Sequence, residues 1–177
     1  MDSRQIDVVL KSDSIVTANN FLGVFPSDKI PSASVKIYPC CAVVNTKPHD
    51  HPGEHWVCFL KTKTNQGIYF DSYGVPPYNL PEIAEVLDGC DSWTFNDISL
   101  QTPFSTVCGQ YTIFALTHLC RGFSLKDIVQ LLDDTSDTYG NDALIFSYIS
   151  NKYYDILYPN KLSIANTSAI LTDLTKL

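Results

Sequence analysis

The sequence predicts an α+β fold, with a central mixed or antiparallel sheet flanked by helices, in a single domain that spans residues 1–177. Three observations lead to this prediction. The chain of 177 residues is long enough to bury one core and short for two. Hydrophobic residues make up 45% of it, an ordinary share for a globular domain. Helix-like and strand-like segments follow one another in the order helix, strands, helix, strand, helices, which is typical of α+β domains.

The first half of the chain supplies one helix and three strands. Apolar residues at helical spacing between residues 3 and 11 predict a short amphipathic helix. Three prolines between residues 26 and 39 then divide the chain into turns and extended pieces. Runs rich in Val, Ile, Phe or Tyr predict strands at 41–45, 55–61 and 67–72, and the polar stretch between the last two is typical of a hairpin.

The second half is mainly helical. Pro81 at a first-turn position predicts a helix over 80–87, and alternating apolar and polar residues predict a strand over 93–100. The main helix is expected over 106–120, capped by Ser105 or Thr106 and closed by Gly122. Two more helices are expected at 124–132 and 142–153, on either side of a loop at 133–140. The last helix should present one apolar stripe, formed by Leu144, Ile145, Tyr148 and Ile149.

Charge and cysteine content narrow the classes of function. The formal net charge is −7. A domain that binds the phosphates of nucleic acid normally has a basic face. Nucleic acid is therefore not expected as the principal ligand. The apolar runs are too short to cross a bilayer, and no charged and apolar leader opens the chain, so export is not expected. Without export, the six cysteines are expected to stay reduced and available for chemistry.

Cys108 stands apart from the other five cysteines because it lies at the predicted start of the main helix. Unpaired N–H groups and the macrodipole at a helix N-terminus stabilise a thiolate. Gly109 follows directly and removes side-chain bulk beside the sulfur, so that a substrate carbonyl can approach. Cys58 lies in an apolar strand, Cys120 lies in the helix, and Cys40 and Cys41 are adjacent, so a buried structural thiol is the simpler interpretation of these four.

A thiolate nucleophile needs an imidazole base, and the imidazole needs an orienting acceptor. His55 begins a predicted strand, and Asp71 ends the next one, so a hairpin with the right register brings them together. His49 and His51 lie in a polar loop and are expected to be solvated. His118 lies ten residues after Cys108 in the same helix, about 15 Å along the axis and out of reach.

Gln101 completes the candidate set. Acyl transfer produces an oxyanion, which a glutamine amide and the backbone N–H of Cys108 can stabilise. A strand that ends near Gln101, followed by the short loop 102–105, would place the amide over the start of the helix.

These residues and their contexts resemble the adenovirus-type cysteine proteases (adenains), members of the superfamily of ubiquitin-like-protein proteases. The likeness rests on "HW" at 55–56, "YFDSYG" at 69–74, and Gln101 followed after six residues by Cys108-Gly109. The stretches "FLGVFPSDKIP" at 21–31 and "CAVVNT" at 41–46 also fit, and the resemblance covers residues 15 to 155. The deSUMOylating relatives usually have one residue fewer in the last spacing and an Asp before the Cys, where this chain has Val107.

The resemblance implies a papain-like fold and a thiol endopeptidase. Cys108 is then the nucleophile, His55 the general base, Asp71 the residue that orients it, and Gln101 an oxyanion donor, with Trp56 beside the catalytic ring. Many adenains have Glu where this chain has Asp71. No cofactor or metal is required for the chemistry.

The resemblance also implies partners and regulation. The substrates are viral or mobile-element-encoded precursor proteins, cut near glycine with an apolar residue upstream, in the virion or in the host nucleus or cytoplasm. Adenains are activated by a peptide that forms a disulfide eighteen positions before the nucleophile, which is Cys90 here. The same position also suits an unpaired thiol. Adenains use DNA as a cofactor, which the acidic composition of this chain disfavours.

Three other hypotheses remain open at this stage. A deubiquitinase or deSUMOylase of the same superfamily would need the same catalytic residues. A zinc-binding module would draw on the Cys and His residues between 40 and 58, although their spacing matches no standard finger. A non-catalytic relative would have lost part of the set, whereas all four residues are present.

Overall fold

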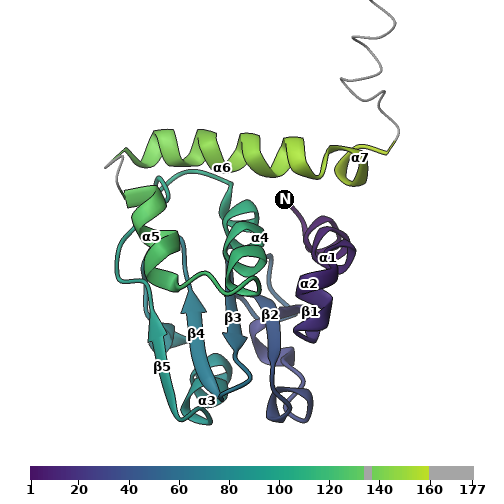
Figure 1. Cartoon of the computed structure of the whole chain (residues 1–177), viewed down its shortest axis with the longest axis vertical. Helices are drawn as coiled ribbons and strands as arrows, with labels where there is room; N and C mark the ends of the chain where they lie inside the picture. Colours follow the sequence, from purple (N-terminus) through teal and green to yellow (C-terminus); the bar gives the residue numbers. More distant parts are fainter. Residues whose placement is uncertain (134–136, 160–177) are drawn as a thin grey trace, which may run out of the picture.

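The computed structural model describes residues 1–133 and 137–159, and residues 160–177 of the predicted single domain lie outside the described part. A five-stranded sheet carries helices on both of its faces (Figure 1). The α-helices are α1 (Ser3–Ser12), α2 (Ser14–Ala18), α3 (Pro81–Asp88), α4 (Cys108–Leu119), α5 (Leu125–Asp133), α6 (Thr138–Lys152) and α7 (Tyr154–Leu157). The strands are β1 (Phe21–Pro26), β2 (Cys40–Asn45), β3 (Trp56–Lys61), β4 (Gln66–Phe70) and β5 (Ser92–Phe95). Short 3-10 turns lie at Ser27–Lys29 (η1), Ser34–Lys36 (η2) and Pro77–Asn79 (η3).

The sheet is mixed, and its spatial order follows the chain from β1 to β5. β2, β3 and β4 form an antiparallel meander, while β1 and β5 pair in parallel with the strands next to them and form the two edges. The predicted hairpin between β3 and β4 is confirmed, with Thr62 donating its N–H to the Gln66 carbonyl at 2.9 Å. The predicted α+β class is confirmed by this arrangement.

Two apolar cores lie on opposite faces of the sheet. The larger core packs α4 against β3 and gathers α1, α2, α5 and α6 around it. The smaller core lies between the other face and α3. Helix α4 is the centre of the larger core, because His118 alone among its twelve residues is not buried. A helix that is apolar on all sides belongs in an interior, so the first residue of α4 is held in a rigid place.

Several predicted boundaries differ from the structure, and the differences have local causes. Helix α4 begins at Cys108 rather than at 106, and neither Ser105 nor Thr106 caps it, since Val107 holds the N-cap position without a side-chain hydrogen bond. Ser105 is engaged elsewhere, by the amide of Gln101. At the other end Gly122 closes the helix as predicted: its φ is 90°, and its N–H binds the Leu119 carbonyl.

The sheet and the last long helix also differ from expectation. β1 was not predicted as a strand because Gly23 and Pro26 weaken the β signal, but it pairs in parallel with β2 at the sheet edge. β5 stops at Phe95 instead of 100, since the Asn96 side chain takes over the pairing with the chain beside it.

α6 begins at Thr138, inside the predicted loop, of which residues 134–136 lie outside the described part. Its apolar stripe is narrower than predicted. Ile145 and Ile149 are fully buried, whereas Leu144 is 51% exposed.

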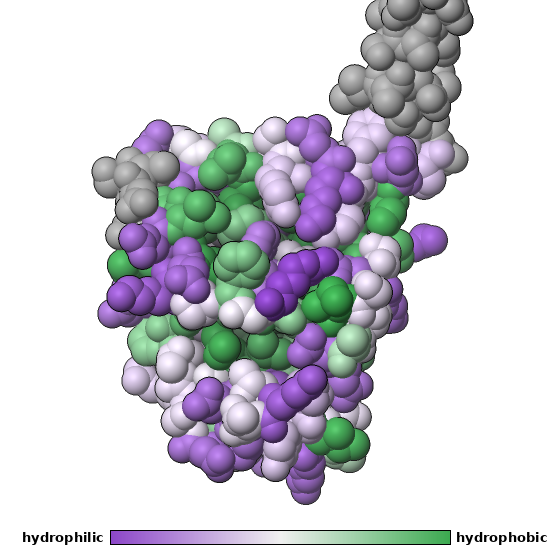
Figure 2. Space-filling view, in the orientation of Figure 1, coloured by the Kyte–Doolittle hydropathy of each residue, from purple (hydrophilic) through white to green (hydrophobic). Residues whose placement is uncertain are grey.

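The surface carries apolar side chains in small groups separated by polar ones on the face shown in Figure 2. None of the helices within the described residues is long and apolar enough to cross a membrane.

Candidate active site

Cys108 is the first residue of α4, and its side chain lies between that helix and the start of β3. The residue is 8% exposed. The backbone N–H groups of Trp56 and Gly109 are near its sulfur and lower the pKa of the thiol. Two N–H donors and the helix N-terminus therefore stabilise negative charge on this sulfur, as the sequence predicted for this thiol alone.

His55 joins the sulfur to a carboxylate. Its Nε2 lies 2.7 Å from Oδ1 of Asp71, and both residues are buried. The same ring hydrogen-bonds with Cys108, and since Nε2 is engaged by Asp71, Nδ1 is the nitrogen left for the sulfur. The β3–β4 register pairs Cys58 with Phe70, and when continued it sets Asp71 opposite Val57, diagonal to His55. The prediction that the hairpin brings these two side chains together is confirmed by this contact.

The protonation of the pair follows from these contacts. Burial on its own lowers the pKa of His55, but the hydrogen bonds and charges of Asp71 and Cys108 outweigh it and raise that pKa to about 9. Burial disfavours the Cys108 thiolate, but the hydrogen bond with His55, the Trp56 N–H and the imidazolium charge lower the pKa of this thiol overall. Both shifts move the pair from neutral thiol and imidazole toward thiolate and imidazolium.

Asp71 is fixed by its own neighbours. Its Oδ1 also accepts the backbone N–H of Tyr73 at 2.8 Å. The side chain of Asn96 binds both backbone groups of Asp71: Oδ1 accepts the N–H at 3.0 Å, and Nδ2 donates to the carbonyl at 2.5 Å. Asn96 is 3% exposed, so these bonds are shielded from water. Sequence analysis missed Asn96, because its role depends on two segments that lie 25 residues apart in the chain.

Tyr73 is a second residue that sequence analysis missed. Its ring stacks on His55 with a centroid distance of 4.6 Å and an interplanar angle of 27°. Its hydroxyl donates to the Pro103 carbonyl and accepts from Nε2 of Gln101, each at 3.3 Å. Trp56 was expected beside the catalytic ring, but the ring stacked on His55 is that of Tyr73. The position of Tyr73 in "YFDSYG", two residues after Asp71, was the available signal.

Gln101 is fully buried, and its side-chain amide is engaged on both sides. Oε1 accepts from the Ser72 hydroxyl at 2.6 Å. Nε2 donates to the Ser105 carbonyl at 3.1 Å and to its hydroxyl at 3.0 Å, in addition to Tyr73. The amide thus reaches the turn that begins α4, three residues before Cys108, but among the described residues no contact joins it to the sulfur. Its role as an oxyanion donor stays a prediction.

Two glycines next to the site have different tasks. A Cβ on Gly109 would lie 3.1 Å from Ile6 Cδ1 and from Met1 Cβ, so this glycine lets α1 pack on α4. It was predicted to leave room for substrate, and α1 fills that room instead. Gly74 has a φ of +68°, and a Cβ there would lie 2.6 Å from the backbone of Ile98. The loop after Asp71 and the segment after Asn96 are therefore in direct backbone contact.

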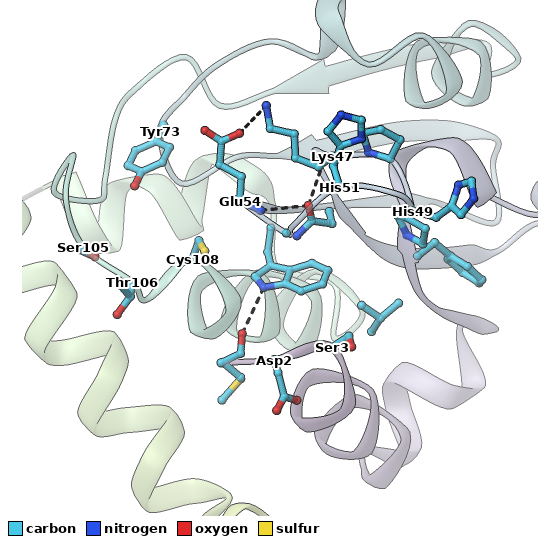
Figure 3. A pocket seen from close by; sticks show the side chains of 18 residues that line it. Asp2, Ser3, Lys47, His49, His51, Glu54, Tyr73, Ser105, Thr106 and Cys108 are labelled. Carbon is cyan, nitrogen blue, oxygen red and sulfur yellow. Dashed lines mark hydrogen bonds and ion pairs between the residues drawn. The ribbon is translucent and has the colours of Figure 1, made fainter.

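A cleft of about 600 Å³ opens beside Cys108. Its floor includes Val24, Phe25 and Pro26 of β1 together with Trp56, whose Nε1 donates to the Met1 carbonyl at 3.3 Å. In Figure 3, Tyr73, Ser105 and Thr106 lie at the Cys108 end, and His49 and His51 at the other. The rim carries ion pairs, including Lys47 with Glu54 at 2.7 Å. The cleft thus has an apolar floor and a rim whose charges are paired.

The other polar residues singled out from the sequence lie away from the sulfur. His49 and His51 are exposed as expected, but each ring pairs with a carboxylate, of Asp28 and Asp50 respectively. His118 donates a hydrogen bond from Nδ1 to the Phe114 carbonyl on its own helix at 2.7 Å. Cys90 is half-buried beside Gly67, and burial raises the pKa of its thiol.

The proposed zinc ligands do not converge. Cys40 lies in the smaller core and Cys41 in the larger one, because adjacent strand residues face opposite sides of the sheet. Within residues 1–133 and 137–159, no three His, Cys, Asp or Glu side chains are grouped as a metal site would require.

Comparisons with known proteins add one structural likeness. No family model matches the chain, and no curated protein matches it. The solved structure of the ASFV pS273R protease is similar over 48% of this chain and 35% of its own, with 24% identity and a TM-score of 0.36. This chain thus spans about a third of the length of that protein. A match of this size does not set the family of this chain.

Proposed function

We propose that the chain is a cysteine endopeptidase. The observation that carries this proposal is the placement of one imidazole ring between the Asp71 carboxylate and the Cys108 sulfur, beside an open cleft. An isolated ion pair of this kind also occurs in structural roles. Here the sulfur lies at the start of a buried helix, receives two N–H donors and has a depressed pKa, which is the environment of a nucleophile.

The chemistry follows from the protonation states. The Cys108 thiolate attacks the carbonyl carbon of a peptide bond, and the C–N bond breaks as imidazolium His55 gives its proton to the leaving amine. The product is a thioester on Cys108. Neutral His55 then takes a proton from water, the hydroxide adds to the thioester, and the thiolate leaves. Asp71 holds the ring in place and stabilises the imidazolium throughout.

Each tetrahedral intermediate carries an oxyanion. The backbone N–H of Cys108 belongs to the first turn of α4, where N–H groups have no partner within the helix, so it is suited to donate to that oxyanion. For Gln101 to be the second donor, its Nε2 has to exchange Ser105 for the substrate oxygen. We therefore propose that substrate binding moves the turn at residues 102–107. This motion would release the Gln101 amide from Ser105 and free it for the substrate oxygen.

The proposed substrates are polypeptides in an extended form, from viral or mobile-element precursors as the adenain resemblance implies. The apolar floor of the cleft fits an apolar residue upstream of the cut. The preference for glycine at the cut stays an expectation from the resemblance.

Regulation by an activator peptide is part of the same proposal. Cys90 lies two residues before β5, which is an edge strand without a further partner among the described residues, so a peptide that extends the sheet there would come close to the thiol. The raised pKa of Cys90 makes it a slow partner for disulfide exchange until a peptide is bound.

Cleavage of peptide libraries by wild-type protein and by Cys108→Ala tests the function. We expect cleavage by the wild type and none by Cys108→Ala, with unchanged circular dichroism. Cys120→Ala, at the C-cap of the same helix, is the matched control and should keep activity. Activity retained in Cys108→Ala would overturn the proposal. Ubiquitin-like substrates with a diglycine tail form a second arm, and a strong preference for them would favour the deubiquitinase or deSUMOylase alternative.

Labelling with iodoacetamide at pH 7 gives an independent readout that needs no substrate. Cys108 should react first among the six thiols, and mass spectrometry of the digested protein identifies the site. Preferential labelling of another cysteine would place the reactive thiol elsewhere.

A further inference from the structure

A second cavity of about 600 Å³ lies far from the proposed active site. It is enclosed by η2, the end of β3 and the outer side of α3, and its lining includes Val35, Lys61 and Val86. His55 immediately precedes β3 and Lys61 ends it, so the two sites are separated by about 20 Å along the strand. The cleavage chemistry makes no use of this cavity.

Lys61 is a buried cation in the wall of this cavity. The residue is 5% exposed, and its Nζ donates to the Val35 carbonyl at 3.0 Å. The ring of Tyr38 lies 5.7 Å from the same nitrogen. No carboxylate of the described residues comes within 4.0 Å of this ammonium. An ammonium has three N–H donors, and a buried charge without a counter-charge is costly, so the site is incomplete as it stands.

A second polar group in the same wall also lacks a partner. Oδ1 of Asn65 is buried and accepts no hydrogen bond from the described part of the chain, whereas Nδ2 of the same amide donates to Gly89 and Asp91. The amide is thereby held in one orientation. The wall thus contains an ammonium with free donors and a carbonyl oxygen with free lone pairs, and both belong to residues that line the cavity.

The remaining lining indicates the kind of molecule that would fit. Ile30, Val35 and Val86 provide apolar surface. Glu82 and Glu85 line the cavity as well, and they repel a dianion such as phosphate more strongly than a single carboxylate. The volume lies in the range of small-molecule sites, roughly 300–1,000 Å³.

We propose that this cavity binds a molecule that carries a single carboxylate and a neighbouring N–H on an apolar body. The carboxylate accepts hydrogen bonds from Lys61, the N–H donates to Asn65 after a small shift of its amide, and the apolar part packs on Val35 and Val86. An N-acyl amino acid has this chemistry. The same combination of a carboxylate and an N–H occurs in a free small acid and also at an acidic residue of a polypeptide. This inference is independent of the proposed protease function.

Titration of the ¹⁵N-labelled protein with N-acetyl-L-leucine, followed by NMR, tests the site. We expect saturable shifts of the Lys61, Asn65 and Val86 amides, and binding at least about tenfold weaker for the neutral N-acetyl-L-leucine amide, since hydrogen bonds between charged groups are strong. A capped peptide, acetyl-Ala-Glu-Leu-amide, forms the second arm. Tighter binding of this peptide through the same residues assigns the carboxylate to a polypeptide side chain.

Two lysine variants make the test specific. Lys61→Met keeps the length of the side chain and removes the charge, and it should weaken binding at least about tenfold. Lys36→Met, at an exposed lysine of the same cavity, is the matched control and should bind as the wild type does. Equal binding of acid and amide, equal binding by Lys61→Met, or no shift at the cavity would each overturn the proposal. If Lys61→Met does not fold, the comparison of acid with amide on the wild type decides.

Discussion

Replacement of Asp71 by Asn should move the titration of the catalytic imidazole by a large and measurable amount. In the wild type the pKa of His55 is raised from 6.5 to about 9, a difference of 2.5 units. At about 1.4 kcal/mol per unit, this corresponds to roughly 3 kcal/mol in favour of the imidazolium. An adjacent carboxylate typically contributes one to three of those units, so we expect the midpoint to fall by about two units in Asp71→Asn.

The ring itself has to be observed, because unfolding experiments hide the shift. The raised pKa of His55 contributes stability that is complete below pH 6.5 and is lost as pH rises through about 9. The lowered pKa of Cys108 acts oppositely, with stability that grows as pH approaches the ordinary thiol value of 9.0. Where both groups titrate, the two effects on the free energy of unfolding have opposite signs and offset each other. The pH dependence of unfolding therefore does not isolate the shift in the pKa of His55.

The assay is NMR titration of the imidazole Cε1–H groups between pH 5 and 10. The signal of His55 is identified by its absence in His55→Gln. Asp50→Asn is the matched control, because Asp50 pairs with the exposed His51 and has no contact with the site. We expect it to leave the His55 midpoint unchanged. A midpoint in Asp71→Asn within about half a unit of the wild-type value would refute the assignment of Asp71 as the group that holds the proton on the ring.

Three further variants test the supports of the site. Tyr73→Phe loses the hydrogen bonds of the hydroxyl to Gln101 and Pro103, each of which contributes about 1 kcal/mol. In steady-state peptide cleavage, kcat should therefore fall roughly tenfold or more while KM changes little. A rise in KM alone would contradict a positioning role for Tyr73. Asn96→Ala leaves the backbone N–H and carbonyl of Asp71 without their buried partners. The free energy of unfolding, measured with urea at pH 7, should fall by about 2–3 kcal/mol. A fall below about 0.5 kcal/mol would contradict the role of Asn96 as a support of Asp71. Gly109→Ala introduces a methyl group 3.1 Å from Ile6 and Met1. In the same assay the free energy of unfolding should fall by about 1–3 kcal/mol. An unchanged urea midpoint would mean that α1 shifts away from the methyl group without loss of stability.

The sequence predicts those parts of the fold that depend on local pattern. The antiparallel strands have dense runs of β-branched and aromatic residues, and the hairpin between them is short, so β2, β3 and β4 were predicted to within a residue or two. β1 was not predicted, because a parallel edge strand is stabilised by its neighbour rather than by its own composition. The start of α4 was misplaced by two residues because Ser105 has the chemistry of an N-cap but binds Gln101 instead.

The candidate site shows the same division. Cys108, His55 and Asp71 were predicted together because nucleophile, base and orienting acid are recognisable by type and by their places at element ends. Asn96 and Tyr73 were not predicted, since their roles arise from contacts that exist only after the chain has folded. The hydrogen bond between the Gln101 amide and Ser105 was not predicted either, because it depends on where the turn at Ser105 lies in the folded chain.

The contact between Gly74 and Ile98 limits how this scaffold can be re-engineered. The backbone at Gly74, after Asp71, touches the backbone at Ile98, before Gln101. The two segments therefore cannot change conformation independently of each other. A graft that exchanges either stretch for that of another protein must therefore carry both, with glycine retained at position 74, whereas the charged border of the cleft around Lys47 and Glu54 is open to recombination on its own.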